Sequence, residues 1–207
     1  MSDGGRCGRR RHLLRQGPIL LRTAGIEDMA VGLAAASDSE AQHWLGWRPE
    51  QICPEPVRTQ CLETVPRRDP AAGRRKAGSH DYFAAIDAGT GRLLGMIGIS
   101  LAGDRERYEM GGWLAPAFRG RGLGGALFQA ASHLAHEHMG IAELVAGTEA
   151  ANVASQRSLV AAGFVPGDGP DPHILPNGRV ITARWFRHGA TAQLCRRGGV
   201  RAWLGVP

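Results

Sequence analysis

Apolar and polar residues follow a pattern along the first half of the chain that predicts a strand, a helical region and then a β-meander. Residues 19–23 form a short apolar run, and residues 25–47 carry apolar side chains at helical spacing. Strands are predicted at residues 81–87, 92–101 and 108–114, because these segments suit strands and glycine-containing turns separate them.

Helices and strands alternate in the second half. Apolar residues repeat at helical spacing after the glycine-rich residues 119–125, and residues 143–148 then predict a strand. Residues 152–162 predict a helix that Gly163 ends. A hairpin is predicted last, with arms 173–176 and 179–186 joined by Asn177-Gly178, the strongest short hairpin signal.

Three segments lack such a pattern. Residues 1–16 are rich in glycine and arginine and are interpreted as a disordered basic leader. Prolines punctuate residues 48–79, where one helix is predicted near residues 55–65, followed by a basic loop. Residues 189–207 are interpreted as a C-terminal tail. The sequence therefore predicts one folded domain over residues 17–188.

Charge is distributed unevenly over the 207 residues. The formal net charge is +6. Hydrophobic residues make up 43% and charged residues 21% of the chain, and this composition is typical of a globular domain. The leader, residues 66–78 and the tail from residue 184 are strongly basic, so the remainder is acidic. These basic stretches lack interleaved aromatic residues and any nucleic-acid-binding motif, which argues against a nucleic-acid partner.

Cysteine usage and hydropathy favour a cytoplasmic protein. The cysteines are scattered without a C-x-x-C pair, so neither a disulfide framework nor a zinc site is indicated. No apolar run suits a signal peptide or a membrane span. His133 and His136 lie close to Glu137 on one predicted helix, but a solvated helix face is the favoured interpretation, and no metal is predicted.

The strongest chemical signal is the stretch Arg119-Gly120-Arg121-Gly122-Leu123-Gly124-Gly125 between a strand and a helix. Glycines allow the backbone to approach a ligand, and free N–H groups at a helix start bind anions. The two arginines strengthen the case for a diphosphate ligand. A Walker A loop is excluded because the only lysine is Lys76. A dinucleotide site and a connector without a ligand stay open as alternatives.

These motifs resemble a known family. Arg119-x-x-Gly122-x-Gly124 is similar to the acetyl-CoA pyrophosphate loop of the GNAT superfamily, and Asn152-x-x-Ser155 followed by Gly163-Phe164 resembles the RimJ/RimL-like group of ribosomal-protein N-acetyltransferases. The resemblance covers roughly residues 18–187. It implies an α+β, three-layer GNAT fold, in which helices flank a mixed, mostly antiparallel sheet with splayed central strands.

The resemblance also implies acetyl-CoA as the acyl donor. Backbone N–H groups of residues 119–125 would hold its pyrophosphate. Its pantetheine arm would pair with backbone groups near Trp113 and Leu114, in a gap between two splayed strands, and would bond to Asn152. Gly111-Gly112 would mark a bulge that parts these strands. Tight packing of the glycines and a plain helix N-cap at Asn152 are the alternatives.

Catalytic residues follow from the chemistry of an amine that attacks a thioester. The amine must be neutral, and Glu109 is the predicted general base because strand alternation puts it on the face of Gly111 and Trp113. Many superfamily members protonate the leaving thiolate with a tyrosine, but this chain has Leu159 at that position. Ser155 is the predicted substitute. Solvated positions for Glu109 and Ser155 are the alternatives.

The sequence constrains the identity of the acceptor less than that of the donor. Trp44, Trp47 and Phe83 are predicted to line its pocket, with core packing as the alternative. The leading hypothesis is an N-acetyltransferase that acts on a protein N-terminal α-amine. A small-molecule acetyltransferase acting on an aminoglycoside, polyamine or amino acid, and a non-catalytic CoA-binding module, stay open. Transfer of an acyl group other than acetyl, and assembly as a homodimer, also stay open.

Overall fold

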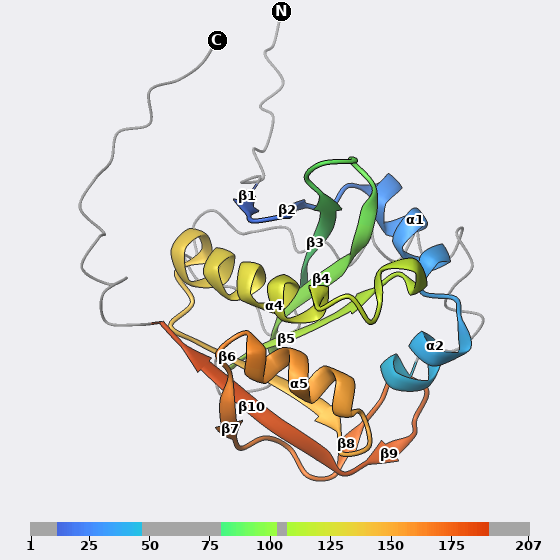
Figure 1. The fold of residues 1–207 in the computed structure, drawn as a ribbon. Helices are drawn as coiled ribbons and strands as arrows, with labels where there is room; N and C mark the ends of the chain where they lie inside the picture. Colours follow the sequence, from blue (N-terminus) through green and yellow to red (C-terminus); the bar gives the residue numbers. More distant parts are fainter. Residues whose placement is uncertain (1–11, 47–79, 103–106, 191–207) are drawn as a thin grey trace, which may run out of the picture.

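One eight-stranded sheet organises the computed structural model, which describes residues 12–46, 80–102 and 107–190 (Figure 1). The strand order is β1-β2-β3-β4-β5-β6-β10-β7. Neighbouring strands are antiparallel except for the central pair, β5 and β6, which is parallel. This arrangement confirms the predicted mixed, mostly antiparallel α+β fold.

The first half of the sheet is a meander, as predicted. Its strands are β1 (Leu13–Gln16), β2 (Ile19–Thr23), β3 (His80–Asp87), β4 (Leu93–Ala102) and β5 (Arg107–Leu114). The leader interpretation is wrong for residues 13–16, which pair with β2 at the sheet edge. Only two of its four residues, Leu13 and Leu14, are apolar and none is fully buried, so ladder hydrogen bonds hold this edge strand and its short sequence gave no strand signal.

The predicted helical region at residues 25–47 contains two helices. These are α1 (Ile26–Ala35) and α2 (Ser39–Leu45). The side chain of Asp38 caps α2 by accepting a hydrogen bond from the Ala41 N–H at 3.1 Å, so the second helix starts there. The predicted helix near residues 55–65 and the basic loop after it lie outside the described residues.

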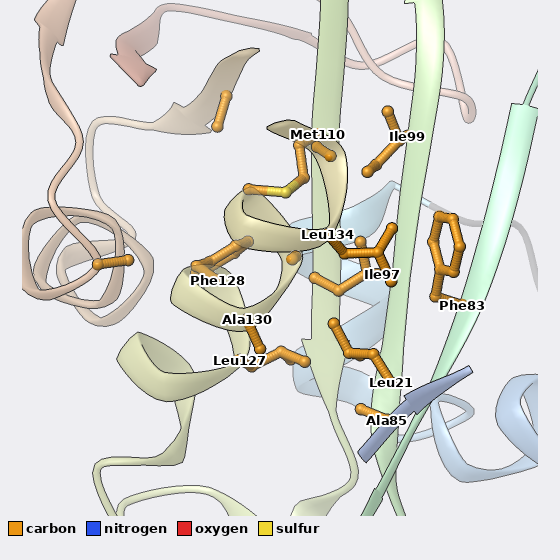
Figure 2. Packing of buried hydrophobic residues seen from close by; sticks show 14 of the residues in the cluster. Leu21, Phe83, Ala85, Ile97, Ile99, Met110, Leu127, Phe128, Ala130 and Leu134 are labelled. Carbon is orange, nitrogen blue, oxygen red and sulfur yellow. The ribbon is translucent and has the colours of Figure 1, made fainter. Parts of the chain in front are cut away.

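Two further helices cover one face of the sheet (Figure 1). They are α4 (Leu123–His133), which continues as a π-helical turn over Leu134–His138, and α5 (Val153–Ala161). Figure 2 shows Leu127 of α4 and Leu134 of the π-helical turn against Ile97 of β4, in the main hydrophobic core. In the ranges that the structure describes, no helix is long and apolar enough to cross a membrane.

The second half of the sheet differs in part from the predicted hairpin. Its strands are β6 (Glu143–Glu149), β7 (Val165–Gly167) and β10 (Ala183–Gly189), while β8 (His173–Ile174) and β9 (Val180–Ile181) form a separate small hairpin. The predicted second arm therefore divides, and β10 pairs with β6 because Trp185 and Phe186 become buried there. β10 also extends one residue past the predicted domain limit.

Helix α1 packs on the sheet face opposite α4. A Cβ atom added to Gly32 would lie 2.2 Å from the Met96 sulfur and 3.4 Å from the Trp113 ring, so a larger residue here would require the Met96 side chain to move. Phe83 was predicted to line the acceptor pocket, but this prediction is wrong because Phe83 is 1% exposed and belongs to the core. Its large apolar ring stabilises the sheet instead.

Candidate active site

The two central strands part where the sequence predicted a gap. β5 and β6 pair only at Tyr108–Leu144 and Glu109–Val145, so residues 110–114 of β5 have no partner on β6. The predicted bulge at Gly111-Gly112 is wrong, because β5 keeps its register with β4 without a shift. Gly112 instead allows close packing, since a Cβ there would lie 2.5 Å from Ile97 Cδ1.

Backbone groups that line this gap can be assigned from the ladder. The N–H of Ala115 donates to the carbonyl of Leu94 at 2.8 Å, so Ala115 faces β4. Because backbone groups alternate along a strand, Gly112 and Leu114 face β6 across the gap, whereas Trp113 faces β4. The prediction for Trp113 backbone groups is therefore wrong. Gly112 and the N–H of Leu114 present the groups that an extended ligand would pair with, whereas the Leu114 carbonyl already accepts a hydrogen bond from Arg119 Nε at 2.9 Å.

The wall formed by β6 follows the same alternation. The N–H of Ala150 donates to the Thr182 carbonyl at 3.4 Å and so points toward β10. Gly147 then points its backbone groups toward β5 and into the gap. A Cβ on Gly147 would lie 2.8 Å from the Trp185 ring, so the indole closely covers one side of this wall.

Glycines in the loop after β5 have two different functions. Gly120 and Gly122 have φ values of 71° and 74° with open space around them, so the turn needs residues that tolerate positive φ. Gly124 and Gly125 lie in the first turn of α4, where added Cβ atoms would come within 2.4 Å of Ser158 and 2.9 Å of Ala161 on α5. The sequence pattern alone does not distinguish loop geometry from helix packing.

The start of α4 has the properties of an anion site. No side chain caps this helix, whereas α2 and α5 are capped by Asp38 and Asn152. The first N–H groups of α4 are therefore left for solvent or a ligand, and the helix dipole favours a negative charge there. Leu123, the first residue of α4, is half-buried and packs its side chain against the core.

The two loop arginines have different environments. Arg121 is exposed, so its guanidinium is available to a phosphate. The guanidinium lies 6.0 Å from the Phe118 ring centroid. Arg119 binds both carboxylate oxygens of Asp38 at 2.7 Å, which takes its side chain away from the anion site. A phosphate contact predicted for this side chain is thus not what the structure shows. The backbone of Arg119 still enters the loop.

Glu109 lies where the strands begin to part. It is the last residue of β5 that pairs with β6, and alternation puts its side chain on the face of Gly111 and Trp113. The side chain is half-buried, and it forms no ion pair within the described residues. A carboxylate at this point is next to the gap, and no residue that the structure describes neutralises it.

Asn152 and Ser155 meet at the start of α5. The Asn152 side-chain oxygen accepts a hydrogen bond from the Ser155 N–H at 3.0 Å, so Asn152 is the helix N-cap. This leaves the amide nitrogen of Asn152 available to a ligand. The Ser155 side chain is half-buried one turn into the helix. Both residues follow β6, at the same sheet edge as the glycine loop.

The aromatic residues predicted for the acceptor side are not brought together. Trp44 is half-buried on α2, with its ring edge-on to His43 at 4.5 Å between centroids. Trp47 lies outside the described residues, and Phe83 is in the core. A separate hollow of about 860 Å³ lies between α5 and β10, and no residue of the glycine loop lines it.

Of the two histidines that were predicted on a solvated face, His133 is exposed as predicted, but His136 is not. His136 is 9% exposed, and its Nε2 lies 2.9 Å from Nδ1 of His188 on β10. Burial, and then the neighbouring His136, lower the pKa of His188 below its ordinary value. No group of three or more metal-binding side chains occurs in the described ranges.

This histidine pair predicts an acid-sensitive stability. As pH falls below about 6.5, the unfolded chain takes up a proton that folded His188 resists, so the free energy of unfolding falls. We expect His188→Gln to make this decline between pH 7.5 and 5.5 shallower, as measured by urea unfolding. His133→Gln, at an exposed histidine, is the control and keeps the wild-type slope. Equal slopes in all three proteins would contradict the assignment.

Comparisons with known proteins agree with this geometry. A family model described as an acetyltransferase (GNAT) domain matches residues 19–165. No curated protein sequence matches the chain. RimL, a ribosomal L7/L12 α-N-protein acetyltransferase in complex with coenzyme A, has a TM-score of 0.68 at 15% identity, covering 86% of this chain and 98% of that one.

Two further solved structures share the fold. The ribosomal-protein-S5-alanine acetyltransferase of Vibrio fischeri has a TM-score of 0.67 at 17% identity, over 86% of this chain and 96% of that one. The spermidine N-acetyltransferase of Vibrio cholerae, in complex with CoA and spermine, has a TM-score of 0.67 at 14% identity, over 83% and 95%.

The splayed parallel pair and the uncapped helix after a glycine loop suit an acyl-CoA-dependent transferase. The family match covers well over half of the sequence, and this chain belongs to the GNAT acetyltransferase family. Enzymes of this family transfer an acetyl group from acetyl-CoA to an amine. The resemblance seen in the glycine motif is therefore confirmed.

Proposed function

We propose that this enzyme acetylates a protein N-terminal α-amine, with Glu109 as the general base. The observation that carries the proposal is the position of Glu109, at the point where β5 leaves β6 and free of any arginine in the described residues. A carboxylate there is placed to take a proton from an amine that approaches a thioester in the gap.

The acetyl donor fits the residues around the gap. Backbone N–H groups of residues 120–125 and the exposed Arg121 would hold the pyrophosphate. The backbone groups of Gly112 and Gly147 and the N–H of Leu114 would pair with the pantetheine arm, together with the amide of Asn152. The Gly112 N–H would meet the charge that develops on the thioester oxygen, and Ser155 would donate a hydrogen bond to the leaving sulfur.

Charge around the ends of the two strands favours a singly charged acceptor over a polyamine. Asp38 and Glu40 hold Arg119, and Glu149 holds Arg179 at 2.7 Å, so these carboxylates are already neutralised. A polyamine would have to displace those arginines, whereas one α-amine needs only Glu109. An α-amine with a pKa near 8 also loses its proton more readily than a lysine near 10.4.

An acceptor screen tests this proposal. Release of free CoA would be measured with lysine-free peptides of varied first residue, with the same peptides blocked by N-terminal acetylation, and with spermidine. We expect turnover with the free α-amines alone. Equal or faster turnover with spermidine would instead favour the small-molecule hypothesis, and no turnover with any amine would favour a CoA-binding module.

A further inference from the structure

Helix α2 is short, and contacts with other elements hold it at both ends. It contains seven residues, which is too few for a helix to be stable by itself in water. In Figure 1, α2 lies between the loop that follows β5 and the β8–β9 hairpin. Ala41 in its middle is buried, and the groups that bind its first and last turns fix the position of its two ends.

Arg119 ties the first turn of α2 to the end of β5. Its Nε donates to the carbonyl of Leu114 at 2.9 Å, and its Nη1 and Nη2 donate to the two oxygens of Asp38. Nη1 also donates to Glu40 at 3.1 Å. The hydrogen bond from Arg119 is the main cause that lowers the pKa of Asp38 to about 2, so the pair stays charged at neutral pH.

Arg179 ties the last turn of α2 to the end of β6. Its Nη1 donates to the carboxylate of Glu149 at 2.7 Å, and its Nη2 donates to the carbonyl of His43 at 2.6 Å. Glu149 is the last residue of β6. Close packing adds to this end, because a Cβ on Gly46 would lie 2.5 Å from Leu175 Cβ.

Both arginine contacts therefore join α2 to the walls of the same gap. The carboxyl ends of parallel strands lie at one edge of a sheet, so Leu114 and Glu149 mark the mouth of the gap. We propose that α2 spans this mouth and holds the two strands at a fixed separation, and we call it a crossbeam for this reason. Arg119 and Arg179 are then positioning residues that fix the separation of β5 and β6 during acetyl transfer. This inference rests on the proposed function, since it assumes that the thioester lies in the gap.

The competing interpretation is that the two arginine contacts are independent surface ion pairs. Such pairs contribute little to stability and would not depend on one another. A crossbeam behaves differently, because it fixes a distance only while both ends are attached. The two interpretations therefore predict different results when both ends are released together.

A double-variant experiment separates them. Asp38→Asn removes the bidentate ion pair and leaves only the exposed Glu40 contact between Arg119 and α2. The helix cap is kept, because asparagine caps a helix about as well as aspartate does. Glu149→Gln releases the other end. Glu143→Gln is the matched control, since Glu143 is on the same strand and faces Arg187 at 3.9 Å far from the mouth. Melting temperatures of all variants are measured alongside kcat and the KM for acetyl-CoA.

We expect each single variant to lower kcat about 10-fold, because small misplacements of reacting groups are costly. The double variant should lose no more than the more impaired single variant, while Glu143→Gln keeps wild-type kcat. Losses that multiply to about 100-fold in the double variant would overturn the crossbeam. So would variants that melt lower but keep their kcat.

A second measurement needs no acceptor. Amide hydrogen exchange of the unliganded protein is followed at residues 110–114 and 146–149. We expect either single variant to speed exchange in both segments, with no further gain in the double variant. Unchanged exchange in both segments would refute the crossbeam. If the wild-type protein acetylates no amine, the proposed function fails, and this measurement still decides whether α2 holds the strands.

Discussion

Replacement of Glu109 by glutamine should reduce kcat on the order of 100-fold or more, while the affinity for CoA stays as in the wild-type protein. The side chain keeps its size but loses the ability to accept a proton, and general bases contribute about 10² to 10⁴ in rate. Glu109 lies beside the gap and not at the glycine loop, so donor binding should not depend on it. Initial rates with a peptide acceptor and calorimetric titration with CoA measure the two effects.

Glu143→Gln provides the comparison for a carboxylate on the neighbouring strand without a proposed function, and it should retain full activity. If the Glu109→Gln variant turned over within about twofold of the wild-type rate, proximity alone would account for catalysis, and the assignment of Glu109 as the general base would be wrong. Loss of CoA affinity together with activity would instead place Glu109 in the donor site.

The second large effect is expected at the glycine loop. Gly122→Val should weaken CoA binding by about 100-fold, because a β-branched residue does not tolerate the φ of 74° that aims the loop amides at a ligand. The backbone would have to change conformation, and the anion site at the start of α4 would be lost. Titration calorimetry with CoA measures the change directly.

Gly140→Val is the matched control for this variant. Gly140 lies beyond the opposite end of the same helical segment, has a φ of 69° and also has open space around it. Both variants carry the same kind of backbone strain and should lose similar thermal stability. Only Gly122→Val should lose CoA affinity, so equal affinity in the two variants would exclude the loop as the pyrophosphate site.

Much of this architecture was predictable because local signals are strong where burial and turns coincide. The strands at residues 19–23 and 108–114 and the helix after the glycine loop follow the hydrophobic period. Asn177-Gly178 correctly marked a turn, but only two residue pairs of the hairpin formed there. The rest of the second arm pairs with β6 instead, because burial of Trp185 there stabilises it more than a longer hairpin would. Burial of this kind depends on residues that are distant in sequence, so local patterns do not contain it.

The candidate site was predictable in its donor half and less so in its acceptor half. Glycine spacing identified the loop, yet it could not show that Gly124 and Gly125 are needed for contact with α5. The arginines illustrate the limit most plainly. Arg119 looked like a phosphate ligand, but Asp38, 81 positions earlier in the sequence, binds its guanidinium. Arg179 gave no signal at all, because both of its partners are distant in sequence.

Everything proposed for this enzyme requires that coenzyme A bind with its diphosphate on the amides of residues 120–125 and its pantetheine arm between β5 and β6. A crystal structure of the protein with CoA tests this most directly. We expect phosphate oxygens within hydrogen-bonding distance of those N–H groups, and a pantetheine arm paired with Gly112 and Gly147. CoA found in the hollow between α5 and β10, or a gap closed by direct pairing of the two strands, would contradict it.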